Sequence, residues 1–163
     1  MINIITAAEI DGYGSDDTNF DSALLNAPPE SSSAFEAEII APIIEVLDSA
    51  DQTAVLLVTG HGDRVDTVGL TREQRRQQEL DVSFTRSANA KQSVQRIVAI
   101  RRGSPPEISE NELFDLFREI KQLVFSTRGA GAAGLVQAGD PLTEEQRRQN
   151  RRVAFTLIRF LPT

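Results

Sequence analysis

The sequence contains no cysteine and only one histidine, His61. The missing cysteines exclude disulfides and thiolate metal sites, although they do not identify the cellular compartment. A zinc site is a weak interpretation as well, because structural zinc needs several nitrogen or sulfur ligands. We therefore expect neither a metal nor another cofactor.

Long apolar runs and an excess of basic side chains are also missing. The N-terminal stretch MINIITAAEIDGYGSDD has no basic region and no long apolar run, so it is not a secretory signal. No stretch approaches the ~20 apolar residues that span a bilayer, and we expect no direct membrane insertion. The formal net charge of −7 argues against nucleic-acid binding, because neutralising phosphates requires a basic surface.

What is present is an ordinary globular composition, with 40% hydrophobic and 25% charged residues. A length of 163 residues favours one domain with a sizeable core. We treat residues 1–163 as this single domain. Residues 1–33 form an N-terminal strand and an irregular segment, and residues 34–161 form the core.

Hydrophobic periodicity predicts an α+β sandwich with helices on one face of a sheet. Ser33 and Glu36 resemble a capping box at the start of the first helix, and Pro42 should kink that helix. The expected strands are 2–10, 53–60, 121–127 and 152–160, and the expected helices are 34–50, 71–101 and 109–120, with a short capped turn at 142–150.

Nearly the same eight residues occur twice, as LTREQRRQ at 70–77 and LTEEQRRQ at 142–149. Their flanks do not match, so they are not a duplicated domain. Each copy can be a capped helical turn, with threonine as the N-cap and glutamine three residues later. Two unrelated, solvated helix starts are the simple interpretation. Our hypothesis is that both turns lie near the same end of the domain.

Two motifs suggest an enzyme but fail on their surroundings. GAGAAG (129–134) fits the dinucleotide fingerprint literally, yet Gly139 and Pro141 prevent the long helix that this fingerprint needs. His61, Asp63 and Ser83 lack a nucleophile elbow, so a catalytic triad is not supported. We expect a flexible glycine-rich connection, a structural His61 whose ring hydrogen-bonds loop backbone, and no enzymatic activity.

Asp63 and Asp66 follow the apolar run at 53–60. Carboxylates at the carboxyl end of a buried strand lie where ligands often bind in α/β proteins. Without further context, ligand-binding and solvated, turn-forming aspartates are about equally well supported. Arg86, taken alone, is interpreted as a surface arginine.

Five segments, in chain order, together resemble the OmpA-like peptidoglycan-binding domain, the type found in OmpA, Pal and MotB. The resemblance spans residues 18–161 and implies a β/α/β/α/β-β two-layer sandwich. Its helices would cover one face of a mixed four-stranded sheet, with an extra helix inserted near 109–120. The segments are NFDSALL (19–25), VLLVTGHGD (55–63), VSFTRSANAKQSV (82–94), RGAGAAGLVQAGDP (128–141) and NRRVAFTLIRF (150–160).

The resemblance also implies a function and a set of ligand-binding residues. The domain would bind the diaminopimelate of the peptidoglycan stem without catalysis and anchor the protein or its assembly to the cell wall. Asp63 would pair with the ligand's ammonium, and Asp66 competes for this role. Arg86 would pair with the ligand's carboxylate, Arg151 would border the site, and Asn150 would fix its loop.

Departures from the family pattern motivate an alternative. Glu79 stands where the family often has asparagine, and residues 103–120 look like an insertion. The chain would then be a structural or interaction subunit of an envelope-spanning or phage-tail-like assembly that keeps the fold without the ligand. The expected partners are peptidoglycan and other subunits of such an assembly. The expected location is the cell envelope, facing the periplasm. Because no signal peptide is recognised, a cytoplasmic or particle-associated location is the alternative.

Overall fold

The computed structural model describes residues 1–163 and contains one four-stranded sheet in the order β1-β4-β2-β3. The strands are β1 (Ile2–Ile10), β2 (Thr53–Gly60), β3 (Leu123–Gly129) and β4 (Val153–Leu161). β4 is antiparallel to both β1 and β2, whereas β3 is parallel to β2. The expected α+β class with a mixed four-stranded sheet is confirmed.

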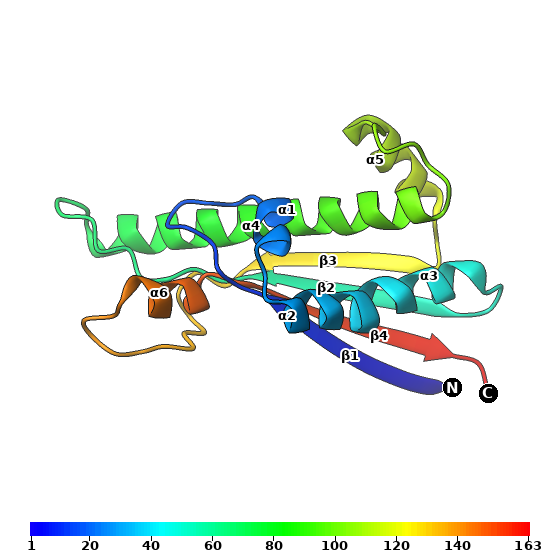
Figure 1. Ribbon diagram of the computed structural model, residues 1–163, viewed down its shortest axis with the longest axis horizontal. Helices are drawn as coiled ribbons and strands as arrows, with labels where there is room; N and C mark the ends of the chain where they lie inside the picture. The colour runs from blue at the N-terminus through cyan, green and yellow to red at the C-terminus, as the bar shows by residue number, and fades with distance from the viewer.

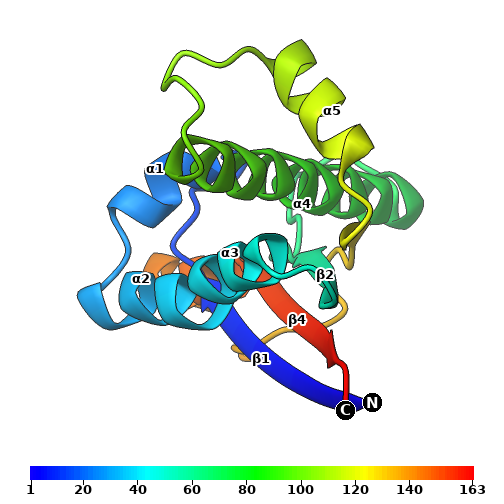
Figure 2. The same cartoon turned by 90° about the vertical axis from the view of Figure 1, so that its right-hand side faces the viewer.

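The helices α1 to α5 lie on one side of this sheet, with α5 outermost, and α6 lies at the sheet's end (Figures 1 and 2). The expected inserted helix is therefore present as α5. None of the helices is both long and apolar enough to span a membrane. The helices are α1 (Phe20–Leu25), α2 (Pro29–Phe35), the π-helix η1 (Glu36–Ile40), α3 (Ala41–Asp48), α4 (Arg72–Arg101), α5 (Glu110–Glu119) and α6 (Glu144–Asn150).

The first long helical stretch begins earlier than its sequence predicts. Helix α2 starts at Pro29 rather than at a capping box on Ser33, so that prediction is wrong. Proline suits the first turn of a helix, because its fixed φ is already helical and its missing N–H has no partner there. The π-helix η1, which is wider than an α-helix, ends at Ile40, two residues before Pro42. Pro42 cannot donate a backbone hydrogen bond, so the regular α-helical pattern is interrupted here.

One face of the sheet forms the core. Residues that alternate along β2 and β4, such as Leu56, Val58 and Leu157, are fully buried against the helices. The rings of Phe20, Phe35 and Phe155 pack against one another with centroids 5.1 to 5.5 Å apart. This period of two is the pattern of a sheet with one covered face.

Helix α4 approaches the ends of β2 and β3 very closely. A Cβ on Gly60 would lie 1.7 Å from the backbone oxygen of Ser83, and one on Gly129 would lie 2.6 Å from the backbone nitrogen of Phe84. Only glycine allows this approach. The two glycines thereby place the middle of α4, including Arg86, against the carboxyl ends of these strands.

The two repeated octapeptides are both capped helix starts. Thr71 and Gln74 form a capping box at the start of α4, and Thr143 and Gln146 form the same box at the start of α6. Both turns lie at the same end of the molecule, as Figure 1 shows. The hypothesis that both turns lie near the same end of the domain is therefore confirmed.

Candidate functional site

A cavity of about 470 Å³ opens at this end of the molecule, between the loop after β2, the first half of α4, and α6. Asp63, Asp66, Arg86 and Arg151 all contribute to its wall. Asn150 stands behind Asp63 and donates a hydrogen bond to it. The structure thus brings together all five residues that the sequence singled out.

Asp63 is the buried anion of the cavity. Its side chain is 4% exposed, and each of its oxygens has a partner. Oδ1 accepts from Nδ2 of Asn150 at 3.0 Å, and Oδ2 accepts from Nη1 of Arg147 at 2.7 Å. Nη2 of Arg151 lies 3.9 Å from Oδ2. A buried carboxylate needs such partners, because burial without them is strongly unfavourable.

Asn150 connects Asp63 to the glycine-rich loop between β3 and α6. Its Oδ1 accepts from the backbone N–H groups of Val136 and Gln137, each at 2.8 Å. Its Nδ2 also donates to the carbonyl of Gln137 at 2.9 Å. Fully buried and fully satisfied, this amide fixes both the loop and the carboxylate of Asp63.

Arg147 is the functional residue that the sequence reasoning missed. Its Nη1 donates to Asp63 at 2.7 Å, and its Nη2 donates to Asp66 at 2.8 Å, so one guanidinium bridges both candidate anions. The hydrogen bonds to Asp66 and Asp63 raise the pKa of Arg147 above its ordinary value. The available signal was its position four residues before Arg151, which places both arginines on one face of a helix.

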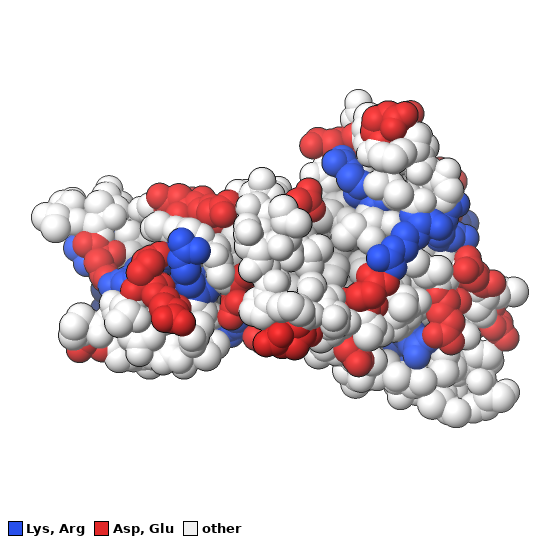
Figure 3. Space-filling model, viewed as in Figure 1, with Lys and Arg blue, Asp and Glu red and all other residues white.

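Arg151 is also nearly buried and already paired. Its Nη1 donates to Oε1 of Glu144 at 2.7 Å, which joins the first turn of α6 to its end. The hydrogen bond from Arg151 lowers the pKa of Glu144. Acidic and basic side chains lie next to one another at this end of the molecule, as Figure 3 shows for the visible face.

Arg86 is not the surface arginine that its local sequence suggested, because it is 1% exposed. Its guanidinium donates to four backbone carbonyls, those of Gly14, Ser15, Asp17 and His61, at 2.8 to 3.1 Å. It also lies 4.9 Å from the centre of the Tyr13 ring. Burial lowers the pKa of Arg86 to about 10, so the group stays charged at neutral pH. One N–H on Nη1 has no partner within the protein.

His61 does not use its ring as expected. Its backbone N–H donates to the carbonyl of Arg152 at 2.8 Å, whereas Nδ1 of the ring is buried without a partner. Burial, with the nearby charges of Arg152 and Arg128, lowers the pKa of His61 to about 4. The expectation of a ring hydrogen bond to loop backbone is wrong, because the backbone N–H of His61, and not its ring, holds the end of β2 to Arg152.

Ser83 is engaged in structure and has no link to His61. Its hydroxyl donates to the carbonyl of Leu80 at 2.9 Å and accepts from the N–H of Gly131 at 2.9 Å. The structure also has no group of three or more His, Cys, Asp or Glu side chains arranged to hold a metal ion. The chemistry of the site is therefore that of its carboxylates and guanidinium groups.

The cavity combines anions and cations at fixed separations. Glu79 accepts from the N–H of Val65 at 2.9 Å, which holds the loop that carries Asp63 and Asp66. A wall of this kind suits a small zwitterion, because carboxylates accept from an ammonium and a guanidinium fork matches a carboxylate.

No family model and no curated protein matches the chain. Solved structures that match include the cell wall anchor of the T6SS from Pseudomonas aeruginosa, at 17% identity and a TM-score of 0.41 over 93% of this chain and 80% of that chain. The C-terminal domain of Helicobacter pylori MotB matches at 17% identity and a TM-score of 0.44, over 94% and 86% of the two chains. A putative MotB-like protein from Desulfovibrio vulgaris matches at 16% and 0.42, over 94% and 74%.

MotB-type domains are among those that the sequence resembles, and MotB domains are among the solved structures that match. Identities of 15 to 18% and TM-scores of at most 0.44 carry no argument about ligands or residue roles. The ligand and the roles of the residues must therefore be inferred from the geometry of the cavity.

Proposed function

We propose that the chain binds peptidoglycan through the diaminopimelate of its peptide stem, without catalysis, and so anchors itself or its assembly to the cell wall. The observation that carries this proposal is the buried carboxylate of Asp63, fixed by Asn150 at the wall of an open cavity of about 470 Å³ among guanidinium groups. The free end of diaminopimelate carries one ammonium and one carboxylate, and the cavity offers a partner for each.

The ammonium would bind at Asp63 and Asp66. The guanidinium of Arg147 is paired with both carboxylates, so the ligand must displace it. The side chain of Arg147 is 25% exposed and comes from the short helix α6, which allows it to swing outward. Because one cation replaces another, the net gain is smaller than the about 1.5–3 kcal/mol of an isolated charged hydrogen bond.

The carboxylate would bind on the arginine side of the cavity. Arg86 retains one N–H without a partner in the protein, and Arg151 also lines the cavity. Affinity for one stem peptide is then modest. Attachment to a repetitive mesh raises the residence time through avidity and places the chain in the cell envelope, facing the periplasm.

Co-sedimentation with purified sacculi tests this function. The wild-type chain should pellet with sacculi, and Asp63→Asn, which keeps size and removes charge, should lower the bound fraction at least tenfold. Arg147→Ala should bind more tightly, because it removes the internal competitor. Asp115→Asn, on the surface of α5, is the control and should behave as wild type. Failure of both the wild type and Arg147→Ala to pellet would refute the proposal.

One observation favours a second function, that of a structural subunit which keeps the fold and lacks the ligand. The charges of the cavity already neutralise one another, since Arg147 covers both aspartates and Arg151 covers Glu144. Such a subunit would join an envelope-spanning or tail-like assembly through other surfaces. Stable incorporation into a particle without any binding to sacculi would support this alternative.

A further inference from the structure

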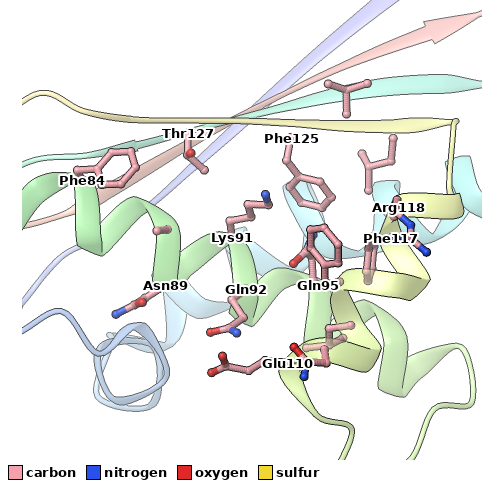
Figure 4. Close-up of a pocket in the computed structure, with 16 residues that line it drawn as sticks. Phe84, Asn89, Lys91, Gln92, Gln95, Glu110, Phe117, Arg118, Phe125 and Thr127 are labelled. Atoms are coloured by element: carbon pink, nitrogen blue, oxygen red, sulfur yellow. The ribbon is translucent and has the colours of Figure 1, made fainter.

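A second hollow, of about 830 Å³, lies on another side of α4, between α4, α5 and β3 (Figure 4). Its wall is rich in phenylalanine. Phe84 and Phe114 are 53% and 66% exposed, and Val124 is 55% exposed. Open apolar surface of this kind, bordered by polar side chains, is typical of a protein-interaction site. We refer to this hollow as the β3 groove.

The inserted helix α5 builds one wall of the β3 groove. Leu113 packs against Ala99 and Ile108, which anchors α5 to the end of α4. The Phe117 ring meets the Phe125 ring of β3 edge to face, with centroids 5.8 Å apart. The insertion thus creates the groove and holds it open, while Phe114 on the same helix stays exposed.

The groove runs along an unpaired strand edge. β3 is the last strand of the sheet and pairs only with β2. The N–H of Ala54 donates to the carbonyl of Gln122, and the N–H of Ala130 donates to the carbonyl of Gly60. In a parallel ladder, alternate residues turn both backbone groups to the same side. Phe125 and Thr127 therefore direct their N–H and C=O groups away from β2, toward the free edge.

The charged residues that line the groove are Lys91, Arg118 and Glu110. Arg118 is paired with Asp115 and Glu119 at 3.5 and 3.4 Å. Lys91 forms no ion pair and lies 5.8 Å from the centre of the Phe125 ring. In a chain of net charge −7, an unpaired ammonium within an apolar groove favours a carboxylate of the partner.

We propose that the β3 groove binds an extended segment of a partner protein, which adds to the sheet as a further strand beside β3. Backbone groups of the segment would pair with those of Phe125 and Thr127. Alternate side chains would enter the groove as apolar groups, and one carboxylate would meet Lys91. Strand addition obtains affinity from backbone hydrogen bonds and specificity from side-chain pockets. The free edge favours a strand over a helix, because a helix leaves these backbone groups unpaired.

This inference does not depend on the proposed ligand. Arg86 and Val82 on α4 face the cavity of Asp63, whereas Phe84 and Lys91 on the same helix face the β3 groove. Both sites can therefore be occupied at once. Loss of sacculus binding and loss of partner binding would be separate results, obtained with different variants.

Selection from a phage-displayed library of random ten-residue peptides, with the full chain as bait, tests the proposal. The recovered peptides should alternate apolar and other residues and should carry an acidic residue. One such peptide, synthesised and labelled, is then titrated against variants. Lys91 and Phe114 both line the groove, so Lys91→Glu and Phe114→Ser should each weaken binding at least fivefold.

The sharpest variant is Thr127→Pro. Its missing N–H faces the free edge, so the ladder with β2 keeps its hydrogen bonds, and proline is tolerated at such positions. It should weaken peptide binding at least tenfold, whereas the matched Thr127→Val keeps the N–H and should bind within about twofold of wild type. Circular dichroism checks that both variants are folded.

Four results would overturn the proposal. The first is a selection that enriches no peptide, and the second is binding that persists in a folded Thr127→Pro. The third is recovery of helix-forming peptides, and the fourth is sedimentation showing that a second copy of the chain covers the groove. Binding that depends on Thr127, Lys91 and Phe114 together would support it.

Discussion

At the scale of single residues, Arg86 connects segments that lie far apart in the sequence. Its guanidinium joins α4 to the loop at 14–17 and to the end of β2 through four carbonyl groups. Each bond involves a charged donor in a buried place, where an unmade hydrogen bond is costly. Most of the hydrogen-bonding groups of Arg86 therefore hold the wall of the cavity together, and only one N–H remains for the proposed ligand.

Arg86→Lys should destabilise the fold although it keeps the charge. A lysine ammonium cannot reach four carbonyls in the plane of a guanidinium, so we expect a loss of about 2–4 kcal/mol in the free energy of unfolding. Urea denaturation followed by circular dichroism measures this loss. A change under about 0.5 kcal/mol would mean that these bonds contribute little to stability.

Contacts between individual side chains are also what the sequence predicts least well. Asp63, Asn150 and Arg151 were found through a motif resemblance, yet the bridge from Arg147 to Asp63 and Asp66 was not. The carbonyl partners of Arg86 lie 25 to 72 positions away along the chain. Local patterns hold no information about such contacts, so Arg86, taken alone, looked like a surface residue, and only the family resemblance assigned it to the site.

At the scale of elements, the two repeated octapeptides are one capping device used twice. Their capping boxes satisfy backbone N–H groups at the first turns of α4 and α6. The helices differ greatly in length, with 30 residues in α4 and 7 in α6. The cap therefore contributes a larger share of the stability of α6 than of α4, because an isolated helix of two turns is not stable in water.

Thr143→Ala should loosen α6 and its arginines. Loss of an N-cap costs about 1 kcal/mol, which corresponds to about fivefold faster amide exchange in a locally opening helix. We expect this increase at Arg147 and Arg148 by NMR. The matched change Thr71→Ala should lower global stability by a similar amount and leave exchange in α6 unchanged. Equal effects on α6 from both variants would contradict this account.

Gly60→Ala should be severely destabilising, because the new methyl group would overlap the backbone of α4 at Ser83. Overpacking of this kind costs about 1–3 kcal/mol or more. Gly62→Ala is the control, since its Cβ would meet nothing closer than 3.6 Å, and it should change stability by less than about 1 kcal/mol. Thermal unfolding compares the two. Similar melting temperatures would show that α4 does not need this close approach.

Elements were the level that the sequence predicted best. The alternation in β4, the capping boxes of α4 and α6 and the helix near 109–120 all follow local rules. The sequence of β2 is a continuous apolar run instead, and its alternation in burial was not predicted. The start of α2 at Pro29 did not follow, because a proline-led first turn competes with the capping-box signal at Ser33. The contact of Gly60 with α4 also escaped, since it joins segments that meet only in the folded chain.

At the scale of the whole molecule, stability depends on pH through the only histidine. The pKa of His61 in the folded chain is about 4, against about 6.5 in an unfolded chain. Between these values the unfolded state binds a proton that the folded state does not. The stability that the neutral His61 contributes is therefore fully present above about pH 6.5 and is lost as the pH falls toward 4.

His61→Phe should remove this part of the pH dependence. Allowing for partial exposure of the ring to solvent, we expect His61 to contribute about 1–2 kcal/mol of lost stability between pH 6.5 and 4. Urea denaturation of both proteins across this pH range gives their free energies of unfolding. The difference between the two proteins cancels the contribution of the carboxylates. Parallel curves for the two proteins would show that His61 is not the group responsible.

The central claim is that Asp63 and its neighbours bind the amino-acid end of diaminopimelate. Its most direct test is an NMR titration with a soluble muropeptide that carries diaminopimelate, beside one in which lysine replaces it. We predict saturable shifts around Asp63 and Asn150 with the first peptide only. Binding should be tighter in Arg147→Ala and lost in Asp63→Asn. No saturation, or equal binding of the two peptides, would contradict the claim.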